Sequence, residues 1–368
     1  MFVKLPEYVH KAGCIICART YHPIYKSYSL LSSLFSFRFA QFFLAFLVII
    51  SMKCRSILKY TILVCLFFCA AGVQAQFDAR FSQYWAVPGY YHPGWAGQTE
   101  NKMNIYGTYG MQLMGFTRAP RVMYFGADMP FTLFKKQQGA GVGFFNEAIG
   151  LFRNQRFWGQ YAYQMKIRKG KLGIGLQVGM LNVSFDPSDI NLGDETEDEA
   201  FPTTAESGTA VDIGLGAYYS HPKFYAAFSA HHLTAPRISL GEKSQIKIHP
   251  IVYLTGGYNI QTRNPLISIQ PSMQLQSDFI STRLDVTGRL FYTYRSKVLS
   301  GGLTYSPDTS VTFSFGLTVH GVTLGYAYEC FTSKIGAASG SHDLMIRYAL
   351  DLNVFKKSRN LHKSVRIL

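Results

Sequence analysis

The sequence predicts an all-β protein, a transmembrane antiparallel β-barrel of about 14 strands. Three observations support this fold class: a signal for export, long segments in which apolar and polar residues alternate, and no apolar run after residue 75 as long as a membrane helix. A membrane helix needs about 18 or more consecutive apolar residues, whereas a barrel strand crosses the bilayer with about 9–11 residues.

The export signal lies in residues 52–75. The basic stretch Met52–Lys59 is followed by the apolar run Tyr60–Ala71, and the small residues Val73 and Ala75 occupy positions −3 and −1 of a cleavage site. This order of charged, apolar and small residues is typical of a secretory signal peptide. We therefore predict that the mature protein begins at Gln76.

Residues 1–51 precede this signal and have two interpretations. The apolar stretch Leu30–Ile50 is consistent with a membrane anchor, or translation starts at Met52 and residues 1–51 are an over-extended N-terminal sequence. We favour the second interpretation because an export signal that begins 52 residues into the chain would otherwise be redundant. The Cys14–Cys17 pair has the spacing of a metal site, but no second pair accompanies it, so no metal site is predicted.

Composition narrows the class further. The formal net charge is +15, which suits acidic partners such as lipid phosphates, and no nucleic-acid-binding motif accompanies it. We interpret the basic surface as facing a membrane or a protein partner. Cys330 is the single cysteine after residue 75, so the exported chain has no intrachain disulfide.

Residues 76–101 form an N-terminal segment ahead of the first predicted strand. They contain Pro88, Pro93 and several aromatic residues, and no long alternating run. Two arrangements remain open for this segment. It lies in the barrel lumen as a plug, or it lies on the periplasmic rim as a docking strip.

Residues 102–355 carry the barrel. In Lys171–Leu181 and Val311–Val319, every second residue is apolar, and the residues between are mostly Gly, Thr, Ser or Gln. Period two over nine or more residues indicates a strand with one face toward lipid and one toward a polar lumen. Fourteen such strands are predicted to begin near Met103, Arg121, Gly139, Arg156, Lys171, Thr209, Lys223, Pro250, Leu266, Thr282, Lys297, Thr309, Gly321 and Ser341.

Two connections between the predicted strands are long, Ser184–Ser207 and Leu233–Ile248. We expect both to be extracellular, because long loops of outer-membrane barrels face outward. Residues 356–368 form a basic C-terminal tail beyond the last predicted strand.

Two short motifs, Phe81–Tyr84 and His92–Gly97, lie close behind the predicted cleavage site. They resemble QFSQY and NPAYAG, the opening motifs of the PorP/SprF family of type IX secretion system outer-membrane proteins, although His92, Gly94 and Trp95 depart from the second. Later matches occur in the same order as in the family, at Gly173–Gln177, Leu181–Asp186, Gly325–Glu329 and Gly340–Met345.

The resemblance implies a non-enzymatic component of the type IX secretion system in the outer membrane of a Gram-negative bacterium. It implies a role in the export and surface attachment of secreted proteins such as gliding adhesins, with periplasmic lipoproteins of the machinery and the cargo as partners. Because the match is concentrated near the N-terminus, we expect partner docking there, by Phe81, Gln83, Tyr84, Pro93, Trp95 and Gly97. The alternative function is a transport channel for small or hydrophobic solutes.

Ionisable residues also fall on the predicted lumen face. Glu329, Arg347 and Asp351 occupy lumen positions of the last two strands, and Arg289 and Arg295 are further candidates. Pairing with one another across the lumen is the expected role. A pore-lining or plug-binding role is the alternative.

We predict no catalytic, cofactor or metal site. An outer-membrane hydrolase is the rival class, with Ser229 or Ser341 as nucleophile and His231, His232 or His342 as base. Acyl transfer needs these groups in contact with an orienting third group, and the chain has no Gly-x-Ser-x-Gly turn.

Overall fold

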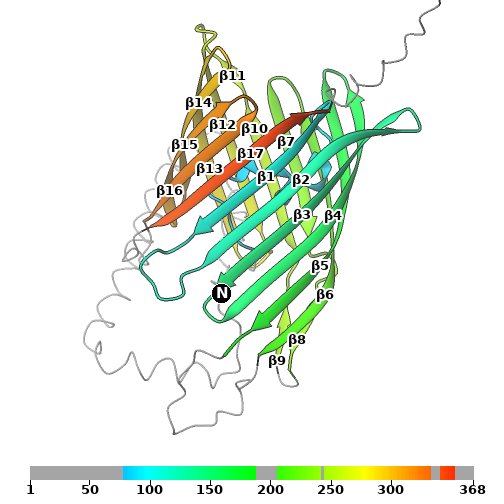
Figure 1. Ribbon diagram of the computed structural model, residues 1–368, viewed down its shortest axis with the longest axis vertical. Coiled ribbons are helices and arrows are strands. Elements are labelled where there is room, and N and C mark those ends of the chain that lie inside the picture. Colours follow the sequence, from blue (N-terminus) through cyan, green and yellow to red (C-terminus); the bar gives the residue numbers. More distant parts are fainter. Residues whose placement is uncertain (1–77, 188–204, 242–243, 333–339, 353–368) are drawn as a thin grey trace, which may run out of the picture. The chain divides into compact units, whose positions relative to one another are not determined.

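The computed structural model describes residues 78–187, 205–241, 244–332 and 340–352. They form a closed antiparallel barrel whose wall has 14 strands (Figure 1), which confirms the predicted fold class. Neighbouring strands of the wall follow each other along the chain, and the last strand, β17, pairs with the first, β1, over ten residues of each. This pairing leaves the wall no open edge, as a sheet in lipid requires.

The wall strands are β1 (Lys102–Met111), β2 (Arg121–Leu133), β3 (Lys136–Ile149), β4 (Phe152–Ile167), β5 (Gly170–Phe185), β6 (Glu206–Ser220), β7 (Phe224–His231), β10 (Ile251–Tyr258), β12 (Ile267–Ser277), β13 (Thr282–Tyr294), β14 (Lys297–Ser306), β15 (Ser310–Val319), β16 (Val322–Phe331) and β17 (Ser341–Asp351). The short strand β11 (Ile260–Gln261) extends the wall beside β12.

The predicted alternation matches the two faces of the wall. Met180 and Phe315 are 58% and 63% exposed on the outside, whereas Gln177 and Thr312 are 3% and 1% exposed on the lumen side. Large apolar residues are exposed in the same way on every wall strand from β1 to β17. A continuous outer band of this kind is stable only in contact with lipid, so the barrel spans a membrane.

The two ends of the barrel differ. One end has two- or three-residue turns at 134–135, 168–169, 221–223, 295–296 and 320–321 and one longer connection, 259–266, which contains β11; the first and last strands also begin and end there. The other end, at the bottom of Figure 1, carries the long connections 112–120, 186–205, 232–250 and 332–340, together with the shorter turns 150–151, 278–281 and 307–309. Short turns face the periplasm and longer loops face outward in barrels of this kind. The two connections predicted to be extracellular both lie at the long-loop end, although 188–204 lies outside the described residues.

The connection after β7 has structure that the sequence did not predict. It contains the hairpin β8 (Arg237–Leu240) and β9 (Ser244–Lys247), which packs against β5 and β6. Ile238 and Leu240 are buried in this contact. Four-residue strands are too short for period two to be recognised among loop residues.

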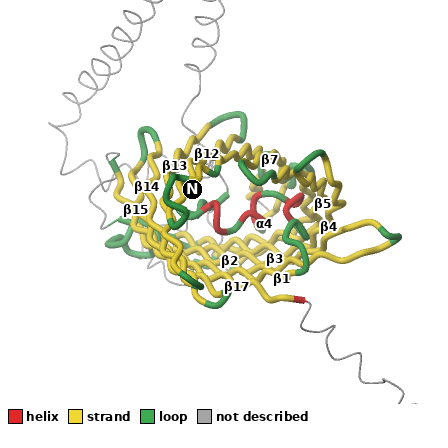
Figure 2. The backbone as a smooth tube through the Cα atoms, turned by 90° about the horizontal axis from the view of Figure 1, so that it is seen from above, coloured by secondary structure: helices red, strands yellow, loops and turns green. Residues whose placement is uncertain are grey.

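The N-terminal part of the described chain lies within the ring of strands, as Figure 2 shows from above. It forms three short helical turns, η2 (Tyr84–Ala86), α4 (Pro88–Tyr91) and η3 (Pro93–Trp95). No helix among the described residues is long and apolar enough to cross a membrane. The predictions for residues 1–51, 52–75 and 356–368 lie outside the described residues.

Candidate functional site

The candidate site is the lumen, and its centre is residues 78–98, which we call the lumenal segment. At the long-loop end, Asp78 contacts Arg156 near the start of β4. At the short-turn end, the Lys171 ammonium donates to the backbone oxygens of Gly97 and Gln98, at 2.8 and 2.9 Å. The segment therefore runs through the lumen from one end to the other before β1 begins.

Proline and glycine determine the local shape of the lumenal segment. Pro88 and Pro93 begin α4 and η3, where the fixed φ of proline suits the first helical position and the missing N–H is no loss. Gly97 has a φ of +70°, a conformation that other residues adopt at a cost. The result is a chain of single turns that follows the wall closely.

Asp78 is the centre of a buried polar cluster at the long-loop end. Its carboxylate accepts hydrogen bonds from Tyr253 at 2.6 Å and His232 at 3.3 Å, and forms an ion pair with Arg156 at 3.0 Å. A second carboxylate, Asp212, lies 3.1 Å from Nδ1 of His232. Two carboxylates thus face two cationic groups, which balances the charge of a site that is almost closed to water.

The opposite charges in the cluster keep both Asp78 and His232 ionised. Burial alone would raise the pKa of Asp78, but the charges of Arg156 and His232 outweigh burial and hold that pKa well below its usual range. Burial likewise opposes protonation of His232, but Asp78 and Asp212 raise its pKa to about 9. At neutral pH the lumenal segment is therefore tied to the wall by full charges.

The raised pKa of His232 predicts a pH dependence of stability. A group whose pKa is higher in the folded than in the unfolded protein contributes its full stabilisation below the unfolded pKa, which is about 6.5 for histidine. That stabilisation is lost as the pH rises through about 9. We expect the free energy of unfolding in detergent to fall between pH 6.5 and 9, and His232→Asn to remove this slope. His320→Asn, in the exposed β15–β16 turn, is the matched control and should keep it; an unchanged slope in His232→Asn would contradict the assignment.

A second charged cluster surrounds Arg80. Its guanidinium contacts Glu329 and lies 3.9 Å from Asp285, and Arg283 pairs with Asp285 at 3.0 Å. Ser310 donates a further hydrogen bond to Glu329. Burial, together with Arg283, lowers the pKa of Arg80 to about 10, so this side chain stays charged at neutral pH. The cluster fixes the segment to β13 and β16.

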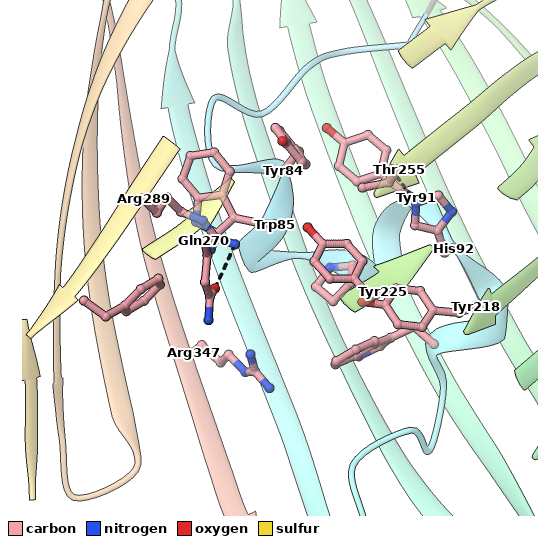
Figure 3. A pocket seen from close by; sticks show the side chains of 13 residues that line it. Tyr84, Trp85, Tyr91, His92, Tyr218, Tyr225, Thr255, Gln270, Arg289 and Arg347 are labelled. Carbon is pink, nitrogen blue, oxygen red and sulfur yellow. Dashed lines mark hydrogen bonds between the residues drawn. The ribbon is translucent and has the colours of Figure 1, made fainter. Parts of the chain in front are cut away.

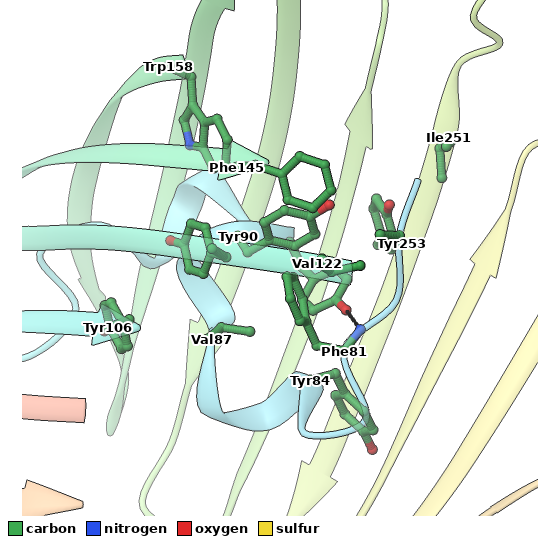
Figure 4. Close-up of a cluster of buried hydrophobic side chains, with 13 residues drawn as sticks. Phe81, Tyr84, Val87, Tyr90, Tyr106, Val122, Phe145, Trp158, Ile251 and Tyr253 are labelled. Carbon is green, nitrogen blue, oxygen red and sulfur yellow. Dashed lines mark hydrogen bonds between the residues drawn. The ribbon is translucent and has the colours of Figure 1, made fainter. Parts of the chain in front are cut away.

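Aromatic packing joins the two clusters. Figure 4 shows Phe81, Tyr90, Phe145 and Trp158 close together between the segment and the wall. The Phe81 and Tyr90 rings meet edge to face at 5.0 Å, and the Phe81 N–H donates to the Tyr91 hydroxyl at 3.2 Å. Such edge-to-face ring pairs stabilise the fold beyond the effect of burying their apolar surface. The buried core of this protein therefore lies in the lumen, between the segment and the wall.

His92 holds the middle of the segment to β7 and β10. Its Nδ1 lies 2.9 Å from the Ser229 hydroxyl and its Nε2 lies 2.8 Å from the Thr255 hydroxyl. Burial lowers the pKa of His92 to about 3, so the ring is neutral. The Ser229 hydroxyl donates to the Tyr91 carbonyl at 2.6 Å and is therefore left to accept from His92.

The structure places the Ser and His residues of the rival hydrolase in separate contacts: His231 Nε2 lies 2.7 Å from the Tyr91 carbonyl oxygen, and His232 belongs to the Asp78 cluster. The ring nitrogen of His92 that faces away from Ser229 meets a threonine hydroxyl and no carboxylate. His342 bonds to the Tyr326 hydroxyl, and Ser341 accepts the backbone N–H of Leu113. Among the residues that the structure describes, no group of three or more His, Cys, Asp or Glu could hold a metal ion.

The residues predicted for docking all lie in the lumenal segment. Trp95 is half-buried and the others are buried, namely Phe81, Gln83, Tyr84, Pro93 and Gly97. In this conformation their contacts are with the barrel wall, as in the bond between the Tyr84 and Ser272 hydroxyls, and with the rest of the segment, as between Phe81 and Tyr90. Docking by these residues stays a prediction, and it requires the segment to leave the lumen.

The predicted lumen charges occupy different levels of the barrel. Glu329 is buried in the Arg80 cluster, Arg347 bonds to Asn104 at 3.0 Å, and Asp351 is exposed near the short-turn end. Of the two further candidates, Arg289 lies in the lumen over the ring of Trp85, whereas Arg295 lies in the β13–β14 turn.

Asp78, Arg156 and Asp212 were not predicted from the sequence, and His232 was considered only as a base of the rival hydrolase. A signal was present for two of them, because Arg156 and Asp212 occupy lumen positions in alternating strands and are ionisable. Nothing in the sequence distinguishes Asp78 from an ordinary loop residue.

The fold and the site together define a class: an outer-membrane β-barrel protein whose lumen contains its own N-terminal segment. The family model described as type IX secretion system membrane protein PorP/SprF matches residues 73–348. The chain therefore belongs to the PorP/SprF family, as the sequence motifs predicted, and is a membrane component of the type IX secretion system and not an enzyme. A comparison with curated protein sequences gave no match.

The solved structures similar to this chain include two hydrocarbon channels and a porin. The CymD monoaromatic hydrocarbon channel has a TM-score of 0.46 at 11% identity, with 76% of this chain and 95% of that chain covered. A mutant of the TodX monoaromatic hydrocarbon channel gives a TM-score of 0.38 at 9% identity, with 68% and 89% covered. A mutant of the Rh. blastica porin gives 0.28 at 11% identity, with 67% and 99% covered.

Proposed function

We propose that this barrel supports the export and surface attachment of secreted proteins, gliding adhesins among them, by engaging periplasmic lipoproteins of the secretion machinery or the cargo. The observation that carries the proposal is the lumenal segment. It crosses the lumen and is anchored at both ends, by Asp78 and Arg80 at one and by Lys171 at the other. A lumen filled in this way favours a membrane component that binds partners over an open conduit.

The exit of the segment offers a surface for such binding. Glu100 and Asn101 are exposed at the short-turn end, which we assign to the periplasm, directly after the anchored Gly97 and Gln98. A periplasmic partner that binds Glu100 and Asn101 would pull on the lumenal segment. Release of the segment would then expose the predicted docking residues, Trp95 first because it is the least buried of them.

The test is affinity purification of the tagged full chain from outer membranes, with mass spectrometry of the bound proteins. We expect secretion-system lipoproteins or a large adhesin to co-purify, and an unrelated outer-membrane barrel with the same tag to recover neither. Isolation of the barrel alone, together with uptake of small solutes, would contradict the proposal and support the transport channel instead.

A further inference from the structure

A pocket of about 270 Å³ lies between the lumenal segment and the barrel wall (Figure 3). Tyr84, Trp85 and His92 line it from the segment, and Gln270, Arg289 and Arg347 line it from β12, β13 and β17. Tyr218 and Tyr225 lie near the short-turn ends of β6 and β7, which places the pocket in the periplasmic half of the lumen.

The lining has two kinds of side chain. Aromatic rings come from both the segment and the wall, among them Trp85, Trp95, Tyr218 and Tyr225. The charged groups of the lining are the guanidinium groups of Arg289 and Arg347, and no lining residue is a carboxylate. Figure 3 shows the two guanidinium groups on one side and Tyr218, Tyr225 and His92 on the other.

The two arginines differ from the other lumen arginines in their partners. Arg80, Arg156 and Arg283 all form ion pairs with carboxylates, whereas neither Arg289 nor Arg347 forms one with a described residue. Arg289 donates to the Gln270 side-chain oxygen at 3.2 Å, and its Nε is buried without a hydrogen-bond partner in the described structure.

The printed contacts of Arg347 are with uncharged groups, and the carboxylate beside those groups accepts hydrogen bonds from them. Arg347 donates to the amide oxygen of Asn104 and lies over the Tyr106 ring, with 5.4 Å between the guanidinium carbon and the ring centre. The Asp128 carboxylate accepts from Tyr106 at 2.7 Å and from Asn104 at 3.1 Å. The pocket is thus bordered by two cationic groups that form no ion pair with a carboxylate in the part of the chain that the structure describes.

We propose that this pocket binds a carboxylate carried on a planar apolar body. The planar guanidinium fork matches a carboxylate in geometry and charge, and aromatic walls accept a flat apolar group between them. The pocket volume suits a single aryl acid or the last residue of a peptide chain. This proposal does not depend on the function proposed above.

The same chemistry has two sources, a free aryl acid in the periplasm and the C-terminal carboxylate of a polypeptide. Tryptophan fluorescence can report the binding of either ligand, because two of the three tryptophans of the chain line the pocket. Binding should therefore change tryptophan fluorescence excited at a wavelength where phenyl groups do not absorb.

The experiment titrates the purified full-length barrel in detergent with N-acetylphenylalanine, its neutral amide, and a pentapeptide that ends in phenylalanine with a free carboxylate. We expect saturable binding of the acid and at least tenfold weaker binding of the amide, since a charge-assisted contact contributes about 1.5–3 kcal/mol. Binding of the pentapeptide as tight as that of the small acid identifies a polypeptide C-terminus as the source; much weaker binding identifies a free acid.

Variants test the assigned groups. Arg289→Gln and Arg347→Gln should each weaken binding about tenfold, and Arg289→Lys should weaken it less. Arg295→Gln, in the β13–β14 turn, is the matched control and should bind as the parent does. Equal binding of acid and amide by the unaltered protein, or no saturable signal for either, overturns the proposal without reference to any variant.

Discussion

Replacing Asp78 with Asn is expected to lower the free energy of unfolding of the barrel in detergent by about 3 kcal/mol. The change keeps the shape of the side chain and removes its charge. Buried Arg156 would lose the carboxylate with which it pairs, and buried His232 would lose one of its two carboxylate contacts and keep Asp212. Breaking a buried ion pair by removing one partner is costly, because the other charge stays out of water without compensation. Tryptophan fluorescence during denaturant unfolding measures the difference.

The matched control is Asp308→Asn. Asp308 is exposed in the β14–β15 turn with a φ of +57°, which asparagine also tolerates. We expect its unfolding free energy to stay within about 0.5 kcal/mol of the parent. Equal stability of the Asp78 and Asp308 variants would show that the Asp78 cluster does not hold the lumenal segment in place.

The wall was predictable because its sequence signal repeats. Side chains alternate across a strand, so the contact with lipid on one face leaves an apolar residue at every second position of strands such as Val311–Val319. The same alternation located Glu329 and Arg347 in the lumen. It could not locate strand ends closely, so β4 begins at Phe152 where Arg156 was predicted.

The lumen contacts were not predictable, because they join residues without regard to sequence spacing. Arg80 meets Glu329 across 249 positions of the chain, and Asp78 meets Tyr253 across 175. No periodicity relates such pairs, and each residue alone is compatible with a solvated loop. The sequence did mark the segment as unusual, through Pro88, Pro93 and its aromatic residues, but left open whether it lies inside the barrel.

Glycines permit the closest approach of the lumenal segment to the wall. The backbone of Pro93–Gly94 lies directly on Gly173 and Gly175 of β5, where a Cβ at either glycine would overlap backbone atoms of the segment. The absence of a side chain at these lumen positions is therefore what allows η3 to lie against the strand.

A bulky residue at this contact is expected to displace the segment and open the lumen. In Gly173→Leu the side chain would take the space of the Gly94 carbonyl, and the wall itself would keep its hydrogen bonds. We expect a larger steady conductance in planar bilayers than the parent shows, with heat-modifiable mobility retained. Gly159→Leu, on the lipid face of β4 where a Cβ meets nothing within 4 Å, is the control and should conduct as the parent does. If Gly173→Leu folds and its conductance equals that of the control, the lumenal segment does not limit the passage of ions through the lumen. The contact between the segment and Gly173 would then have no effect on conductance.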